Sequence, residues 1–112
     1  MGKINSGNSG RLYQRLTNKM TTNTDTILAE RGSRYGTFVG HAEVTQELKR
    51  SMANHLAKRN KTLQDDQWEA LEMIAHKIGR IINGDPDYYD SWADIAGYAK
   101  LVSDRLETGK IV

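Results

Sequence analysis

Acidic side chains recur in the C-terminal half of the sequence at spacings that place them on shared helix faces. Glu69 and Glu72 are three residues apart, and Asp90 and Asp94 are four apart. Carboxylates at these spacings lie on one side of a helix, and Mg²⁺ prefers carboxylate and water oxygens as ligands. An ion held by both pairs could bridge phosphate oxygens and activate a water molecule. These carboxylates are therefore candidate Mg²⁺ ligands, and Glu69 and Glu72 are candidate catalytic residues.

Two cations, Lys77 and Arg80, lie between the acidic pairs. Both could neutralise phosphate charge, Arg80 as a two-pronged donor, so they are candidate substrate-binding residues. A purely structural alternative remains open. Lys77 lies at the edge of an apolar helix stripe, so its stem would be partly buried and its ammonium group could pair with Asp94.

A basic and aromatic turn, Arg34-Tyr35-Gly36, is a further candidate for ligand binding. Tyr35 could stack on a base while Arg34 meets a phosphate. The alternative is that Tyr35 packs beneath the helical core. The sequence allows both readings.

Several other kinds of site are not indicated. The histidines His41, His55 and His76 do not have metal-ligand spacing, and the chain has no cysteine, so zinc is not expected. The glycine-rich phosphate-binding motifs and the serine elbow of hydrolases do not occur.

The composition predicts one domain in 112 residues. A net charge of +2 does not indicate a nucleic-acid partner. The apolar runs are too short to cross a bilayer, and the N-terminus lacks the apolar segment of a secretory signal. We therefore expect a protein of the cytoplasm that does not associate with membranes.

The elements that must position the candidate residues are helices. Apolar residues at positions 44, 48, 52 and 56 predict a helix over 41–58, and those at 68, 71, 74, 75, 78 and 82 predict one over 65–83 that Asn83-Gly84 ends. Asp85-Pro86 then predicts the cap and first turn of a helix that runs to about residue 106. A short helix is expected from Thr24 to Gly32. With no alternating strand pattern, the prediction is an all-α bundle over residues 24–112 with a C-terminal antiparallel αα-hairpin.

Residues 1–23 form a basic N-terminal arm that we expect to be flexible. The arm contains Lys3, Arg11, Arg15 and Lys19 and no acid. Leu12, Leu16 and Met20 could form the apolar stripe of a short helix, and Met20 is also a candidate alternative start.

The segments ILAERGSRYGTF, DQWEALEMIAHKIGRIINGDP and DSWADIAGYAKLV resemble a family of small all-helical domains carried by tailed bacteriophages and prophages. The resemblance covers residues 24–106. A looser resemblance is to the MazG-like all-α nucleotide pyrophosphohydrolases, whose Mg²⁺ site uses an E-x-x-E motif on one helix and an E-x-x-D motif on the next. Glu69 and Glu72 match the first motif, whereas Asp90 and Asp94 depart from the second in spacing and type. The resemblance implies a protein of the bacterial host cytoplasm and a homo-oligomer.

The leading hypothesis is therefore a phage-encoded nucleotide-handling protein, most concretely a Mg²⁺-dependent nucleoside triphosphate pyrophosphohydrolase. One alternative is a non-catalytic module that binds a nucleotide, a signalling molecule or a host protein. The other is a purely structural helical oligomer whose charged residues form ion pairs between helices.

Overall fold

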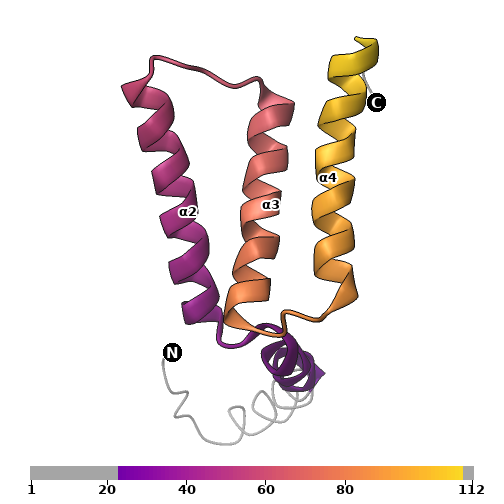
Figure 1. The fold of residues 1–112 in the computed structure, drawn as a ribbon. Helices are drawn as coiled ribbons and strands as arrows, with labels where there is room; N and C mark the ends of the chain where they lie inside the picture. The colour runs from indigo at the N-terminus through magenta and orange to yellow at the C-terminus, as the bar shows by residue number, and fades with distance from the viewer. Residues whose placement is uncertain (1–22, 110–112) are drawn as a thin grey trace, which may run out of the picture. The chain divides into compact units, whose positions relative to one another are not determined.

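The computed structural model describes residues 23–109, and the regular structure in that range is entirely helical (Figure 1). The elements are a helix over residues 23–35, then α2 (Phe38–Lys58), α3 (Asp65–Asn83) and α4 (Tyr89–Thr108). The predicted all-α class is confirmed. The basic arm, Met20 and the helix suggested around Leu16 lie outside the described residues. Within residues 23–109, no helix combines the length and apolar character that a membrane span requires.

The first described helix ends later than predicted. It continues past Gly32 to residue 35, and Gly36 follows with a φ of +76°. The amide of Gly36 donates a hydrogen bond of 2.9 Å to the carbonyl of Gly32. The prediction placed the stop at the wrong glycine, because a glycine inside a helix carries only a modest cost whereas a left-handed residue ends it.

Helix α2 begins at Phe38, three residues before the predicted start at His41. Thr37 is its N-cap, and the Thr37 hydroxyl accepts a hydrogen bond of 3.1 Å from the amide of Gly40. Phe38 and Val39 are exposed and lie outside the apolar stripe, so periodicity alone did not reveal the first turn. The cap residue, and not the apolar pattern, sets this boundary.

Helix α3 has the predicted bounds because several local signals agree. Gln64 and Gln67 form a reciprocal capping box, in which the Gln64 amide donates to the side-chain oxygen of Gln67 at 2.9 Å. Asp65 and Asp66 occupy the first turn, where carboxylates are favoured by the positive helix end. Gly84 follows Asn83 at the other end, as expected.

Helix α4 begins at Tyr89, so the predicted start at Asp85-Pro86 is wrong. The Asp85 carboxylate accepts a hydrogen bond of 2.9 Å from the amide of Asp87, which makes residues 85–88 a turn. The indole N–H of Trp92 donates to the Pro86 carbonyl at 2.8 Å and ties this turn to the helix. The helix ends at Thr108, two residues beyond the predicted end, and Gly109 follows with a φ of +69°.

The chain divides into residues 1–31 and residues 32–112, and the three labelled helices belong to the second unit. Within that unit α3 lies between α2 and α4 and packs against both, whereas α2 and α4 do not contact each other (Figure 1). The predicted αα-hairpin of α3 and α4 is confirmed. The helices thus form a single layer, and globular domains are usually built from two layers packed together.

The interior of this layer is small. Among the described hydrophobic residues only Ala70, Ala75 and Ile81 are buried, and no large side chain is fully buried. Larger apolar residues such as Ile82 and Leu106 are 67% and 60% exposed. The described part of the chain therefore leaves most of its large apolar side chains in contact with solvent.

Candidate functional site

Helix α3 separates charge from apolar surface along its length. With 3.6 residues per turn, one side of the helix carries Glu69, Glu72, His76, Lys77 and Arg80. The opposite side carries Leu71, Ile74, Ile78 and Ile82. Since α2 and α4 flank α3, these sides become two faces of the layer, and the predicted α3 site residues share the charged face.

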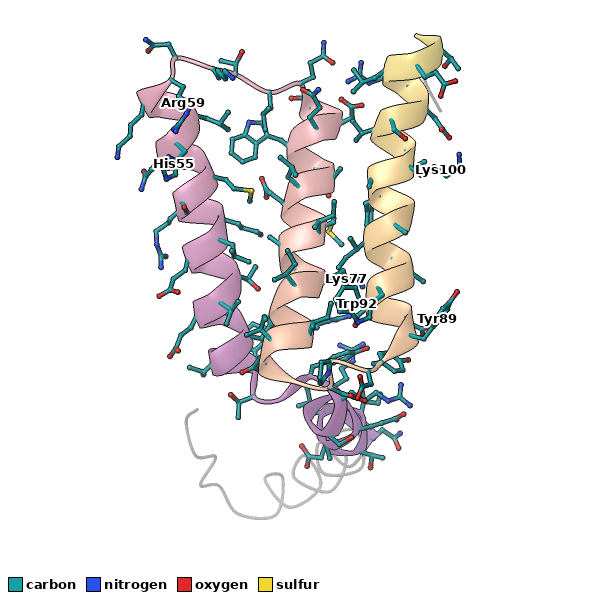
Figure 2. All side chains as sticks on the ribbon, viewed as in Figure 1. His55, Arg59, Lys77, Tyr89, Trp92 and Lys100 are labelled. Carbon is teal, nitrogen blue, oxygen red and sulfur yellow. The ribbon has the colours of Figure 1, made fainter. Side chains whose placement is uncertain are left out.

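The predicted pair between Lys77 and Asp94 is present. The ammonium nitrogen lies 2.8 Å from a carboxylate oxygen, and the Lys77 side chain is only 12% exposed while that of Asp94 is 48% exposed. Figure 2 shows Lys77 reaching from α3 towards α4. The stem is buried and the charge is placed between the helices, as the position of Lys77 at the edge of the apolar stripe predicted.

A second ion pair sets the register of α3 against α4. The Arg105 guanidinium donates two hydrogen bonds to the Asp66 carboxylate, one of them from Nη2 at 2.8 Å. These bonds lower the pKa of Asp66. This pair could not be predicted from the sequence, because it depends on the alignment of two separate helices.

The structure does not bring the four predicted metal ligands together. Glu72 reaches towards Lys49 on α2, with a nitrogen to oxygen distance of 3.8 Å, while Asp94 is held by Lys77. The two ion pairs place Asp94 beside Lys77 and Asp90 near Ile81, so Asp90 is about 13 Å along the helix axis from Glu72. Within residues 23–109, no group of three or more histidine, aspartate or glutamate side chains is arranged to hold a metal ion.

Asp90 has a different partner. Its carboxylate accepts a hydrogen bond of 2.9 Å from the Tyr88 hydroxyl, and this bond raises the pKa of Tyr88. The Tyr88 hydroxyl also accepts a bond of 3.0 Å from Nη1 of Arg34. Asp90 is thus connected to the Arg34 turn and not to Glu69 or Glu72.

The candidate ligand residues Arg34 and Tyr35 belong to a stacked cluster with Arg80 and Tyr88. The Arg80 guanidinium lies 4.3 Å from the centre of the Tyr35 ring, and that of Arg34 lies 4.8 Å from the centre of the Tyr88 ring. The two tyrosine rings meet edge to face at 6.0 Å. These contacts are cation–π and aromatic interactions that hold a turn in place. They favour the packing role for Tyr35.

Asn83 and Gly84 hold this turn against the end of α3. The Asn83 amide group donates to the carbonyls of Tyr35 and Thr37 at 2.7 and 2.8 Å. A Cβ atom on Gly84 would lie 2.2 Å from the carbonyl oxygen of Arg34. The sequence predicted only a helix stop at Asn83-Gly84. In the structure the two residues also join the turn after the first helix to the turn before α4.

The histidines His41 and His76 form a pair that the sequence did not indicate. Nε2 of His41 lies 3.2 Å from Nδ1 of His76, and the rings meet edge to face. Burial, followed by the positive charge of Arg80, lowers the pKa of both and brings that of His76 to about 4. Gly79 makes room for the pair, because a Cβ atom there would lie 2.5 Å from the hydroxyl of Thr45 and 2.9 Å from His41. The pair joins α2 to α3 with both rings neutral.

A groove of about 570 Å³ opens between α3 and α4 near Gln64 and Gly109. Ala70, Tyr98, Leu101 and Val102 are its apolar lining. Its polar lining includes Asp65, Asp66, Glu69 and Arg105. Glu69 therefore faces this groove, while Glu72 turns to α2.

The comparisons with known proteins found no similarity: no protein-family model, no curated protein and no solved structure matches the chain. The reading of its function therefore depends on its own residues.

Proposed function

We propose that this chain is a helical interaction module that works as a homo-oligomer, in which a second copy supplies the missing layer of the bundle. The observation that carries this proposal is an apolar face that helices α2, α3 and α4 leave exposed. We define the apolar face by Leu71, Ile74, Ile78 and Ile82 of α3 and Trp92, Ile95, Ala99 and Leu106 of α4.

The members of the apolar face share one side of the layer. Leu101 of α4 lines the groove with Glu69, on the charged side of α3. Leu106 is five residues further on and so points about 140° away from Leu101. It therefore lies on the same side as Leu71 and Ile78.

This face has the properties of an interface. Ile82, Trp92 and Leu106 are 67%, 55% and 60% exposed, and no charged residue interrupts the face. Burial of such side chains is worth roughly 1.5–3 kcal/mol each, and large exposed apolar patches mark interaction sites. A second copy presents the same uncharged surface, so two layers packed face to face would give each the missing half of its core.

The test is the oligomeric state of the full chain, measured by light scattering during size-exclusion chromatography. The wild type should elute as a dimer or a larger oligomer, and Leu106→Lys should shift it towards monomer because a lysine at the interface would be desolvated. Leu101→Lys is the matched control, since it changes a leucine of similar exposure (51% against 60%) on the other face of the same helix. A monomeric wild type at high micromolar concentration, or an equal effect of both variants, would contradict the proposal.

A second candidate function is the handling of a nucleotide by the charged face. Its support is that Glu69, Glu72 and Lys77 share one side of α3 and that Asp94 reaches Lys77 from α4. Lys77 and Arg80 would meet phosphate oxygens, and Arg34 and Tyr35 belong to the cluster next to Arg80. The Mg²⁺-dependent pyrophosphohydrolase reading would need Glu72 and Asp94 to meet, and as placed these carboxylates do not fit one ion.

This candidate is tested by thermal denaturation with a panel of nucleoside triphosphates, with and without Mg²⁺, followed by an assay for pyrophosphate. A rise in Tm without Mg²⁺ and without product supports a binder, because a ligand of the folded state stabilises it. Product that is lost in Glu72→Gln supports the hydrolase. No shift with any nucleotide would remove this candidate and leave the interaction module.

A further inference from the structure

A second, shallower hollow lies along α4 next to the groove between α3 and α4, and we call the two together the trough. The second hollow, of about 440 Å³, shares Tyr98 and Leu101 with the groove and adds Ala93, Asp94 and Gly97. A Cβ atom on Gly97 would meet nothing within 4 Å, so the trough is open there to an incoming chain. Small side chains at positions 93 and 97, one helical turn apart, would let another helix approach closely.

The trough has an apolar floor and an acidic rim. Tyr98 and Leu101 form the part of the floor that both hollows share. Asp65 and Glu69 stand on the rim, and neither has an ion-pair partner within residues 23–109. The other two acids of the rim, Asp66 and Asp94, are already paired with Arg105 and Lys77. Two carboxylates without an ion-pair partner among the described residues therefore border an apolar channel.

We infer that this trough is the docking site for a cationic amphipathic helix of a partner protein. The apolar side of such a helix would cover Leu101 and Tyr98, and its lysines or arginines would meet Asp65 and Glu69. Recognition of an amphipathic helix in an apolar groove is a recurrent mode of peptide binding. Complementary charges on the rim select the partner and speed its association.

The apolar face of a second copy would not suit this trough. It carries no lysine or arginine and so offers nothing to the acidic rim. The trough lies on the other face of the layer, since Leu101 and Leu106 of α4 point about 140° apart. The two surfaces are therefore independent, and the inference does not rest on the proposed self-association.

The test uses the full chain and a fluorescein-labelled peptide of 18 residues built from leucine and lysine in helical register. Fluorescence anisotropy should report binding that weakens as salt rises. The double variant Asp65→Asn with Glu69→Gln should bind about fivefold more weakly, because it removes two charge pairs from an exposed rim. The same peptide with glutamate in place of lysine should not bind.

Two leucine variants show where the peptide binds. Leu101→Lys should abolish binding, because it places a cation on the floor, whereas Leu106→Lys should bind as wild type even if it changes the oligomeric state. Circular dichroism confirms that each variant is folded, and the double variant keeps the test valid if Leu101→Lys does not fold. Equal binding of both peptides, or unchanged affinity in the double variant, would overturn the inference.

Discussion

Lys77 and Lys100 form ion pairs of nearly equal length that differ in their surroundings. Lys77 contacts Asp94 at 2.8 Å with a largely buried stem, while Lys100 contacts Asp104 at 3.0 Å and is 73% exposed. Figure 2 shows Lys100 on the side of α4 away from α3. Helix packing, and not the ion-pair distance, distinguishes the two lysines.

We expect Lys77→Ala to lower the free energy of unfolding by about 1–2 kcal/mol, because it removes buried stem contacts and leaves Asp94 without its partner. Lys100→Ala should cost less than about 0.5 kcal/mol, as exposed pairs on a helix do. Urea denaturation of both variants measures the difference. Equal losses would mean that the Lys77 stem contributes nothing to the packing of α3 on α4.

The His41 and His76 pair predicts loss of stability in mild acid. Both pKa values are lowered in the folded state, that of His76 to about 4, so the unfolded chain binds more protons below the ordinary value of about 6.5. Stability from the pair is therefore complete above pH 6.5 and falls as the pH drops towards 4. Three cations face the rings, namely Arg80, Lys77 and Lys49. They repel a protonated imidazole and so add to the loss of stability in acid.

From pH 7 to pH 5, the lowered pKa values of the pair should decrease the free energy of unfolding by about 1–2 kcal/mol. His76→Gln should reduce this dependence, and His55→Gln, at an exposed histidine of α2 (Figure 2), should retain it. Chemical denaturation at a series of pH values measures both. A pH dependence that survives in His76→Gln would place its origin elsewhere.

At the scale of elements, the helices, the α3–α4 hairpin and the Lys77–Asp94 pair were predictable, whereas other contacts between helices were not. The first-turn acids of α3 and the Asn83-Gly84 stop after its apolar spacing predicted its two bounds, because each signal is local. The start of α4 at Tyr89 was not predicted. Aspartate is common both in turns and at helix caps, and Asp85 closes a turn here. The Asp66 to Arg105 and His41 to His76 pairs depend on the register of separate helices. The apolar periodicity of a helix predicts that helix, but it does not identify the residues of another helix that pack against it.

The close packing of the turn after the first helix against the end of α3 leads us to expect opposite effects of alanine at two glycines. Gly84→Ala should destabilise the chain by about 2–3 kcal/mol, because the new Cβ atom would lie 2.2 Å from backbone atoms of Arg34 and Tyr35, which cannot move aside. Gly97→Ala, in open space on α4, should instead stabilise by up to about 1 kcal/mol through helix propensity. Thermal denaturation of the two variants measures both effects. A Gly84→Ala variant as stable as wild type would show that the two turns are not closely packed.

At the scale of the whole molecule, the layer formed by α2, α3 and α4, in which Ile82 and Leu106 are exposed, cannot draw much stability from its own interior. If a second copy provides the rest, folding and association are linked, and the stability depends on protein concentration. For a dimer, a tenfold dilution lowers the apparent free energy of unfolding by about 1.4 kcal/mol. We therefore expect the Tm to fall by several degrees on tenfold dilution.

Leu106→Lys should remove this concentration dependence and lower the Tm, whereas Leu101→Lys should keep the dependence. Calorimetry of the full chain over a hundredfold range of concentration makes the measurement. A Tm that is high and independent of concentration would mean that one copy completes its own core. The apolar face would then be an internal surface and not an interface between copies.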